Sequence, residues 1–296
     1  MKALSKRLLA CLALAGVPAG LAAPDGAVRD LRGHFTQGGI FFGRIDAGAQ
    51  LYWGKRRIAT TPEGEFAVGL DRDAPAAVTL KVVAPGGGAA TEQTIAIARR
   101  KYAIQKVTGI PERIMNPRPE DLRRIEDDNR QVAAARATLS AQRFFLGDFR
   151  WPLTGPITGV FGSQRVYNGQ PKRPHYGVDV AAPVGTRVSA PAGGTVTLAH
   201  GDMFFSGGTL IIDHGYGLSS TFIHLSRILV EPGDSVEQGQ QVAEVGATGR
   251  ATGPHLDWRM NWYDQRVDPQ LLVGAMPVAA APAPVYSKHE STGGNE

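Results

Sequence analysis

The chain has 296 residues, a formal net charge of +5 and one cysteine, Cys11. That length exceeds one ordinary domain, so we expect two modest folded units joined by connecting segments. A single cysteine excludes a disulfide framework and a thiolate metal site, and the modest charge gives no indication of nucleic-acid binding. Any bound metal is therefore expected on His, Asp or Glu.

Residues 1–22 are typical of a signal peptide. Lys2, Lys6 and Arg7 form a positive region, residues 8–17 form an apolar core, and residues 20–22 resemble a small-residue cleavage site. The apolar core is too short to span a bilayer, and no later stretch approaches the roughly 20 apolar residues that a transmembrane helix needs. We therefore expect export to the periplasm or beyond, with no transmembrane segment.

Residues 23–112 are expected to form a small β-sandwich domain. Short apolar runs predict strands at residues 39–43, 50–53, 65–69 and 78–83, separated by Gly- and Pro-containing breaks. Helical periodicity is absent from this segment. Because its polar residues form no cluster that suggests chemistry, we interpret it as a binding or spacer domain.

A connecting helix is predicted within a linker over residues 113–146. Residues 119–121, Pro-Glu-Asp, are typical of a first helical turn, and the helix is expected to run to about Ser140. Its narrow apolar stripe indicates a packing face against a neighbouring domain. At the other end of the chain, residues 274–296 are rich in Ala and Pro and then polar, which predicts a flexible tail.

Residues 147–273 carry many short β segments rich in Gly and Pro. Two half-similar phrases begin at Gly185 and Gly233, and their paired turns suit a compact antiparallel structure that reverses direction repeatedly. The chain as a whole is thus predicted to be mainly β. The candidate chemistry lies in this second domain.

Five of the seven histidines fall in this domain, and two of them are paired with aspartates. His175 and Asp179 are four residues apart, and His255 and Asp257 are two apart; an even separation on a strand puts both side chains on one face. Either pair alone is more simply interpreted as scattered polar residues. Together they would supply the three nitrogen or oxygen ligands of a catalytic zinc, with one position left for water.

Three separated motifs together resemble the lysostaphin-type, or LytM-type, zinc endopeptidases that cut the peptide part of peptidoglycan. The motifs are residues 162–179, His224-Leu225-Ser226 and the Gly-Pro-His-Leu-Asp of residues 253–257. The resemblance covers roughly residues 160–269, and the segments before it look like the amino-terminal half of exported Gram-negative members. It implies a duplicated hybrid motif-like fold, one Zn²⁺ per chain and peptidoglycan as the partner.

Carried over position by position, the resemblance implies His175 and Asp179 as metal ligands and His224 and His255 as the catalytic pair. The third ligand departs from the family pattern, because Asp257 stands where a His-x-His motif would end in histidine. A carboxylate ligates zinc at about 2.0 to 2.2 Å. It also brings a second negative charge, so the ion is expected to acidify its water less than in a His-rich site.

Other polar residues of this domain receive weaker assignments. Asn168 and Tyr176 border the first ligand pair and are expected to line the substrate groove, although loop packing explains them about as well. His200 and His214 sit in His-Gly turns and are interpreted as structural. Trp258 follows Asp257 directly, which predicts that it points to the opposite face, into the core.

Three functions are compatible with parts of this sequence. The leading hypothesis is an active peptidoglycan endopeptidase, since four of the five site positions fit the family and the fifth is still a competent ligand. The second is an inactive relative that activates or scaffolds other cell wall hydrolases. The third, a biotinyl or lipoyl carrier, needs a lysine at a hairpin tip, and Lys172 is the last lysine before the tail. The sequence therefore excludes the carrier hypothesis.

Overall fold

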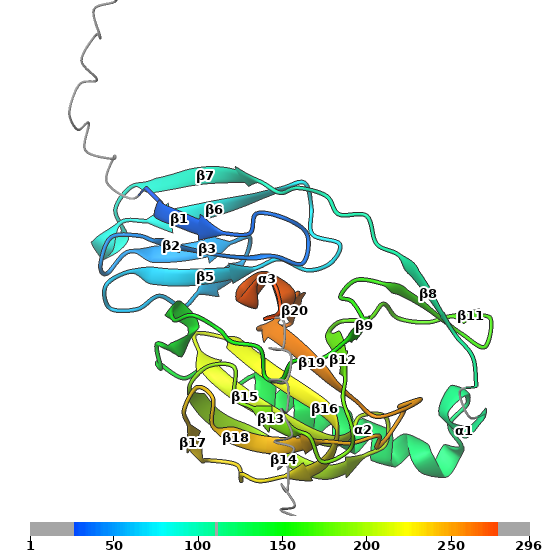
Figure 1. Cartoon of the computed structure of the whole chain (residues 1–296). Helices are drawn as coiled ribbons and strands as arrows, with labels where there is room; N and C mark the ends of the chain where they lie inside the picture. Colours follow the sequence, from blue (N-terminus) through cyan, green and yellow to red (C-terminus); the bar gives the residue numbers. More distant parts are fainter. Residues whose placement is uncertain (1–26, 110–111, 278–296) are drawn as a thin grey trace, which may run out of the picture.

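The computed structural model describes residues 27–109 and 112–277 (Figure 1). The expected signal peptide and most of the expected tail lie outside these residues. Within them the chain forms four β-sheets and a few helical segments, so the prediction that it is mainly β is confirmed. Across these ranges, no helix is both long and apolar enough to cross a membrane.

The amino-terminal part builds two antiparallel sheets, with strand orders β1-β2-β5 and β4-β3-β6-β7. The strands are β1 (Arg29–Gly33), β2 (Ile40–Arg44), β3 (Gln50–Trp53), β4 (Arg56–Ile58), β5 (Glu65–Gly69), β6 (Ala77–Val83) and β7 (Ala90–Ala96). Alternate residues of β6 are buried, which gives its sheet one solvent face and one packed face. Strands β2, β3, β5 and β6 overlap the four strand ranges predicted from sequence.

A small third sheet joins this amino-terminal part to the rest of the chain. β8 (Ile104–Val107) pairs in parallel with β10 (Gln164–Tyr167), which pairs antiparallel with β11 (Gln170–Pro171). Asn168 and Gly169 turn the chain between β10 and β11 with φ angles of 47° and 83°. Both residues are left-handed, as the tight two-residue hairpin requires.

The main helix is α2 (Pro119–Arg136), preceded by α1 (Glu112–Met115). α2 begins where predicted but ends before Ser140, because the large sheet binds the chain beyond it. The Ser140 carbonyl accepts a hydrogen bond from the Tyr216 amide at 3.0 Å, and Gln142 Nε2 donates to Thr195 Oγ1 at 2.7 Å. The other helical segments are short: η1 (Pro85–Gly87), η2 (Phe144–Leu146) and α3 (Gln270–Val273).

The fourth sheet has ten strands and carries the candidate site. Its main order is β17-β14-β15-β16-β19-β12-β9, with β18 on β16 and β13, and β20 on β19. The strands are β9 (Ile157–Gly159), β12 (Val178–Ala181), β13 (Arg187–Ser189), β14 (Gly194–Met203), β15 (Gly207–Gly215), β16 (Leu218–Ile228), β17 (Ser235–Val236), β18 (Gln241–Val245), β19 (His255–Trp262) and β20 (Gln265–Val267). All of its pairings are antiparallel.

The two faces of this sheet differ in character. Alternation along β19 puts Trp258 and Trp262 on one face, fully buried, so the core position predicted for Trp258 is confirmed. Asp257 and Arg259 point from the other face. The helix α2 packs on that second face, where its Ala135 contacts a small apolar cluster made by β14 and β15.

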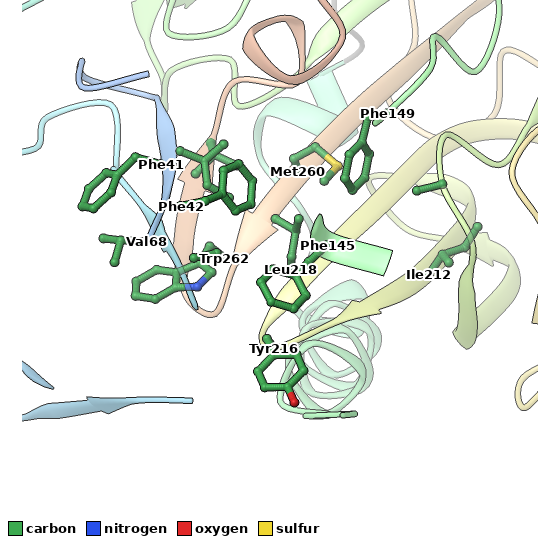
Figure 2. Close-up of a cluster of buried hydrophobic side chains, with 14 of the residues drawn as sticks. Phe41, Phe42, Val68, Phe145, Phe149, Ile212, Tyr216, Leu218, Met260 and Trp262 are labelled. Carbon is green, nitrogen blue, oxygen red and sulfur yellow. The ribbon is translucent and has the colours of Figure 1, made fainter. Parts of the chain in front are cut away.

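One apolar core connects the amino-terminal sheets to the first face of the large sheet (Figure 2). The Trp53 and Trp262 rings stack at 6.0 Å, and Phe145 lies 4.8 Å from Tyr216. At Gly69 an added Cβ would meet the Trp262 side chain at 2.5 Å. Glycine at this position of β5 therefore permits the close approach of β19.

His214, on β15, is buried in this core with both ring nitrogens bonded. Nδ1 lies 2.7 Å from the Gly193 carbonyl and Nε2 lies 2.8 Å from Ser220 Oγ. Because a carbonyl can only accept, Nδ1 carries the proton and Nε2 is the acceptor. Burial lowers the pKa of His214 to about 4, so the folded protein holds this ring neutral.

We expect His214 to make the protein less stable in acid. Its pKa is about 4 folded and about 6.5 unfolded, so below pH 6.5 the unfolded chain binds the extra proton. Stability is therefore lost as pH falls through this window, by about 2 kcal/mol between pH 7 and pH 4.5 from this one group. Urea unfolding at both pH values should show a smaller loss in His214→Asn. An unchanged loss in the variant would contradict the assignment.

Candidate metal site and its imidazole pair

Three side chains converge on the second face of the large sheet. β12 and β19 are neighbouring strands of this sheet (Figure 1). Asp179 on β12 lies directly opposite Asp257 on β19, so both carboxylates project from the same face. His175 reaches them from the loop before β12, where its backbone bonds to Gly162 and Ser163 at 2.7 and 2.9 Å. Strand alternation therefore explains why His255 and Asp257 share one face of β19. The same argument was wrong for His175 and Asp179, because His175 lies in a loop and not on a strand.

The geometry of this triangle fits a metal ion. His175 Nε2 lies 3.0 Å from Asp179 Oδ1 and 3.3 Å from Asp257 Oδ2, and one ligand atom from each residue falls within 4.8 Å of the others. A tetrahedral ion with bonds of about 2.0 to 2.1 Å separates its ligand atoms by about 3.3 to 3.4 Å.

Hydrogen bonding points to the same site. Both ring nitrogens of His175 and Oδ1 of Asp179 are buried without a hydrogen bond of acceptable geometry. Buried polar atoms nearly always have a partner, and a ligated ion would provide one. The residues present thus fit a divalent cation such as zinc.

Two arginines that the sequence reasoning missed bind the two carboxylates. Arg259 forms a bidentate pair with Asp257, at 2.9 Å from Nε to Oδ1 and 2.6 Å from the second nitrogen to Oδ2. Arg165 binds Asp179 Oδ2 at 2.7 Å. Each carboxylate oxygen has two lone pairs, so it can accept from a guanidinium and still ligate a metal. The two positive charges balance the two carboxylates, so a bound cation would keep its excess positive charge.

These contacts set the protonation of the ligands. Burial opposes the ionisation of Asp257, but Arg259 and then His175 outweigh it and hold the pKa of this carboxyl well below its usual range. Burial alone would lower the pKa of His175. The two neighbouring carboxylates reverse that effect, and its pKa is raised.

His224 and His255 lie beside the triangle, with ring centroids 4.9 Å apart. Nδ1 of His224 is 2.7 Å from the Thr248 carbonyl, and Nδ1 of His255 is 2.8 Å from the Gly253 carbonyl. Each Nδ1 must therefore carry the proton, which leaves Nε2 as the basic nitrogen of both rings. His255 Nε2 lies 3.8 Å from Asp179 Oδ1.

The His224 backbone is unusual for a strand residue. Its φ is 66°, in the left-handed region, where the register between β16 and β15 shifts, and its amide bonds to the Ser206 carbonyl at 2.8 Å. Strain of this kind persists only where the surroundings enforce it, and it is frequent at functional sites. Burial lowers the pKa of His224 to about 4 and keeps its ring neutral.

The two weaker groove candidates are placed less directly. Asn168 is an exposed turn residue of the β10–β11 hairpin, with the left-handed backbone that this turn demands. Tyr176 is half-buried, and its ring contacts Phe161 at 6.5 Å and the Arg266 guanidinium at 5.8 Å. Tyr176 thus packs against neighbouring side chains, and the place of both residues in a substrate groove stays a prediction.

Comparison with known proteins agrees with this geometry. Residues 173–269 match Peptidase family M23. A Pseudomonas aeruginosa protein assigned to peptidase M23, known from its crystal structure, is 30% identical; the alignment covers 82% of this chain and 96% of that one, with a TM-score of 0.62. The chain belongs to peptidase family M23.

Curated relatives match the M23 region over shorter stretches. The peptidoglycan DD-endopeptidase ShyA of Vibrio cholerae is 39% identical over 87 residues, which is 29% of this chain and 20% of ShyA. A lipoprotein NlpD/LppB homolog of Pseudomonas aeruginosa is 36% identical over 104 residues, 35% of this chain and 33% of the relative. The match therefore spans a third or less of these two relatives' lengths. The three candidate ligands and the two imidazoles fall within the M23 match, whereas Arg165 and Asn168 precede it.

The Asp257–Arg259 pair provides a stability test that needs no substrate. Replacing Arg259 with Met leaves a fully buried carboxylate without its main counter-charge. In chelator-treated protein we expect the free energy of unfolding to fall by about 2 to 4 kcal/mol, somewhat less than for a fully buried pair because Arg259 is partly exposed. Added zinc should restore part of this loss, since the ion supplies positive charge at the same carboxylate.

Arg227→Met is the matched control for this variant. Arg227 pairs with Glu244 at 3.7 Å and its side chain is 67% exposed, so we expect a cost below about 1 kcal/mol. Denaturant unfolding of both variants with and without zinc makes the comparison. Equal costs for Arg259→Met and Arg227→Met would show that the buried pair does not stabilise the site.

Proposed function

We propose that this M23 protein is a zinc-dependent endopeptidase that hydrolyses peptide bonds in bacterial peptidoglycan. The observation that carries the proposal is the triangle of buried ligand atoms on His175, Asp179 and Asp257, in which His175 Nε2 lies 3.0 and 3.3 Å from the two carboxylates, close to the ligand separation in a tetrahedral site. The name of ShyA, a peptidoglycan DD-endopeptidase, supports the substrate. We place the protein outside the cytoplasm, where peptidoglycan lies, in keeping with the signal peptide expected at residues 1–22.

The domain organisation forms part of the proposal. Residues 23–112 would be a β-sandwich domain, residues 113–146 a helical linker, residues 147–273 the peptidase domain and residues 274–296 a tail. The shared core between the first two sheets and the large sheet supports a fixed arrangement of the two domains. Peptidoglycan is the proposed partner of the second face of the large sheet, where the site lies.

The side chains supply positioning and proton transfer. His175, Asp179 and Asp257 would hold the zinc, which when bound supplies a Lewis acid for the scissile carbonyl and for the attacking water. His224 and His255 present Nε2 as proton acceptors, because backbone carbonyls fix the proton on Nδ1. The ring that accepts the proton of the water can return it to the leaving amine. The second ring, 4.9 Å away, would stabilise the oxyanion of the same peptide bond once its Nε2 is protonated, because only an N–H can donate a hydrogen bond to that oxygen.

A second function is favoured by a different feature of the same site. Arg259 already satisfies both oxygens of Asp257 without a metal, as expected of a domain that has lost catalysis and serves as an activator or scaffold of other wall hydrolases. Metal content and product release separate the two candidates.

The decisive experiment compares wild type with Asp257→Ala on isolated sacculi. We expect wild type to hold one equivalent of zinc by elemental analysis and to release muropeptides, detected by mass spectrometry, in a chelator-sensitive manner. Asp257→Ala should lose the metal, and its activity should fall by more than about a hundredfold. Asp264→Ala, which removes an exposed aspartate from the turn after the same strand, is the control and should keep both properties. Metal-free wild type that releases nothing would favour the activator.

The imidazole pair has a different expected signature. His224→Ala and His255→Ala should each reduce cleavage by about a hundredfold or more while zinc content stays near one equivalent, because neither ring is a proposed ligand. Elemental analysis and muropeptide release on the same preparations make the test. Zinc loss in either variant would reassign that histidine to the metal.

A further inference from the structure

Arg250 is a cation beside the site without a carboxylate partner. Arg165 and Arg259 are each paired with an aspartate of the metal triangle. Arg250, by contrast, forms no ion pair with any carboxylate in the part of the chain that the structure describes. Its positive charge is therefore available for an anion.

The chain holds Arg250 in the loop that positions both imidazoles. Thr248 and Gly253, which flank it, provide the carbonyls that fix His224 and His255. The Arg250 amide donates to the Phe205 carbonyl at 2.8 Å, which anchors the middle of this loop. A ligand that reached Arg250 would thus lie next to the residues proposed to move protons.

Two aromatic rings orient the Arg250 guanidinium. It lies 5.2 Å from the ring centroid of Tyr167 and 4.9 Å from that of Phe205. The Tyr167 hydroxyl accepts a hydrogen bond from Arg165 at 2.8 Å, and Arg165 in turn binds Asp179. A single ring and one further guanidinium therefore separate Arg250 from a proposed metal ligand.

The surroundings favour an anion at this position. Arg250 is half-buried, and burial, together with the nearby positive charges of Arg259 and Arg165, lowers its pKa. A bound anion would therefore stabilise the charged form of the Arg250 guanidinium. The planar guanidinium fork matches a carboxylate in particular, since it can donate two parallel hydrogen bonds.

We propose that Arg250 is a specificity-determining residue that binds a free carboxylate of the peptide substrate close to the scissile bond. The inference rests on the proposed peptidase function and names the chemistry of its substrate: an anionic peptide rather than a neutral one. Aromatic contacts from Tyr167 and Phe205 hold the guanidinium in place before the substrate arrives, which reduces the entropy lost on binding.

The test uses a stem peptide dimer and matched derivatives in which either the terminal or the side-chain carboxylates are amidated. Wild type and Arg250→Gln are compared by kcat and KM on each substrate, and by calorimetric binding of the cleaved product peptides to the zinc-loaded protein. Wild type should prefer one of the acid forms over its amide by about tenfold to a hundredfold in KM and in product affinity. The two amidated derivatives identify which carboxylate is bound.

Arg250→Gln should lose this preference while its kcat on the amidated substrate stays within about twofold of wild type. Arg250→Lys keeps the charge without the fork and should keep part of the preference. Arg187→Gln is the control, because this exposed arginine contacts a carbonyl and a hydroxyl far from the imidazoles; it should behave as wild type.

The outcomes separate this inference from the proposed function. Retention of the acid preference in Arg250→Gln overturns the inference, as does an equal loss of kcat on acid and amide substrates, which would indicate a structural role. If wild type cleaves nothing yet binds acid product peptides in an Arg250-dependent way, the proposed function fails and the carboxylate site stands.

Discussion

The pairing of β12 with β19 places Asp179 directly opposite Asp257 on one face of the large sheet. Two carboxylates this close, one of them fully buried, would repel each other and lose much of their hydration. Three neighbouring side chains reduce this repulsion. His175 lies within 3.3 Å of both carboxylates. Arg165 forms an ion pair with Asp179, and Arg259 forms one with Asp257.

The same constraint changes the electrostatic reasoning about a carboxylate as third ligand. Considered alone, two aspartates would neutralise a divalent ion and weaken its effect on a bound water. Here two guanidiniums already balance the aspartates, so the formal charge of the protein around the ion resembles that of a site built from neutral imidazoles. The replacement of histidine by Asp257 is thus accompanied by a compensating cation, Arg259, two residues further along the same strand.

The sequence predicts those site residues that one strand positions, but not those that loops or tertiary contacts position. His255, Asp257 and Arg259 share one strand, so alternation alone groups them, and Arg259 was detectable by the rule that paired the other two. The placing of His175 depends on a loop held by Gly162 and Ser163, and only the family resemblance indicated it. Arg165 and Arg250 come from other segments altogether, so their contacts follow from tertiary packing, for which sequence spacing gives no signal.

The fold was predictable to a similar degree. Alternating patterns and turn residues indicated a mainly β chain and the start of α2 at Pro119. The end of α2 and the face that it covers were not predictable, because both depend on long-range contacts. Ser140 and Gln142, which follow the helix, form hydrogen bonds with the large sheet, and no local sequence pattern predicts those partners.

The position of α2 bears on how a substrate reaches the site. Ala135 packs on the β14–β15 part of the same sheet face that carries Asp179 and Asp257, and Arg136 bonds to Thr221 on β16. That part of the face is therefore closed to substrate. Two other segments border the ligands: strand β10, whose Arg165 binds Asp179, and the loop before β19, whose carbonyls fix both imidazoles. Tyr167 and Arg250 stand on these two segments, so the guanidinium proposed to bind the substrate carboxylate lies at this border of the site rather than on the part of the face that α2 covers.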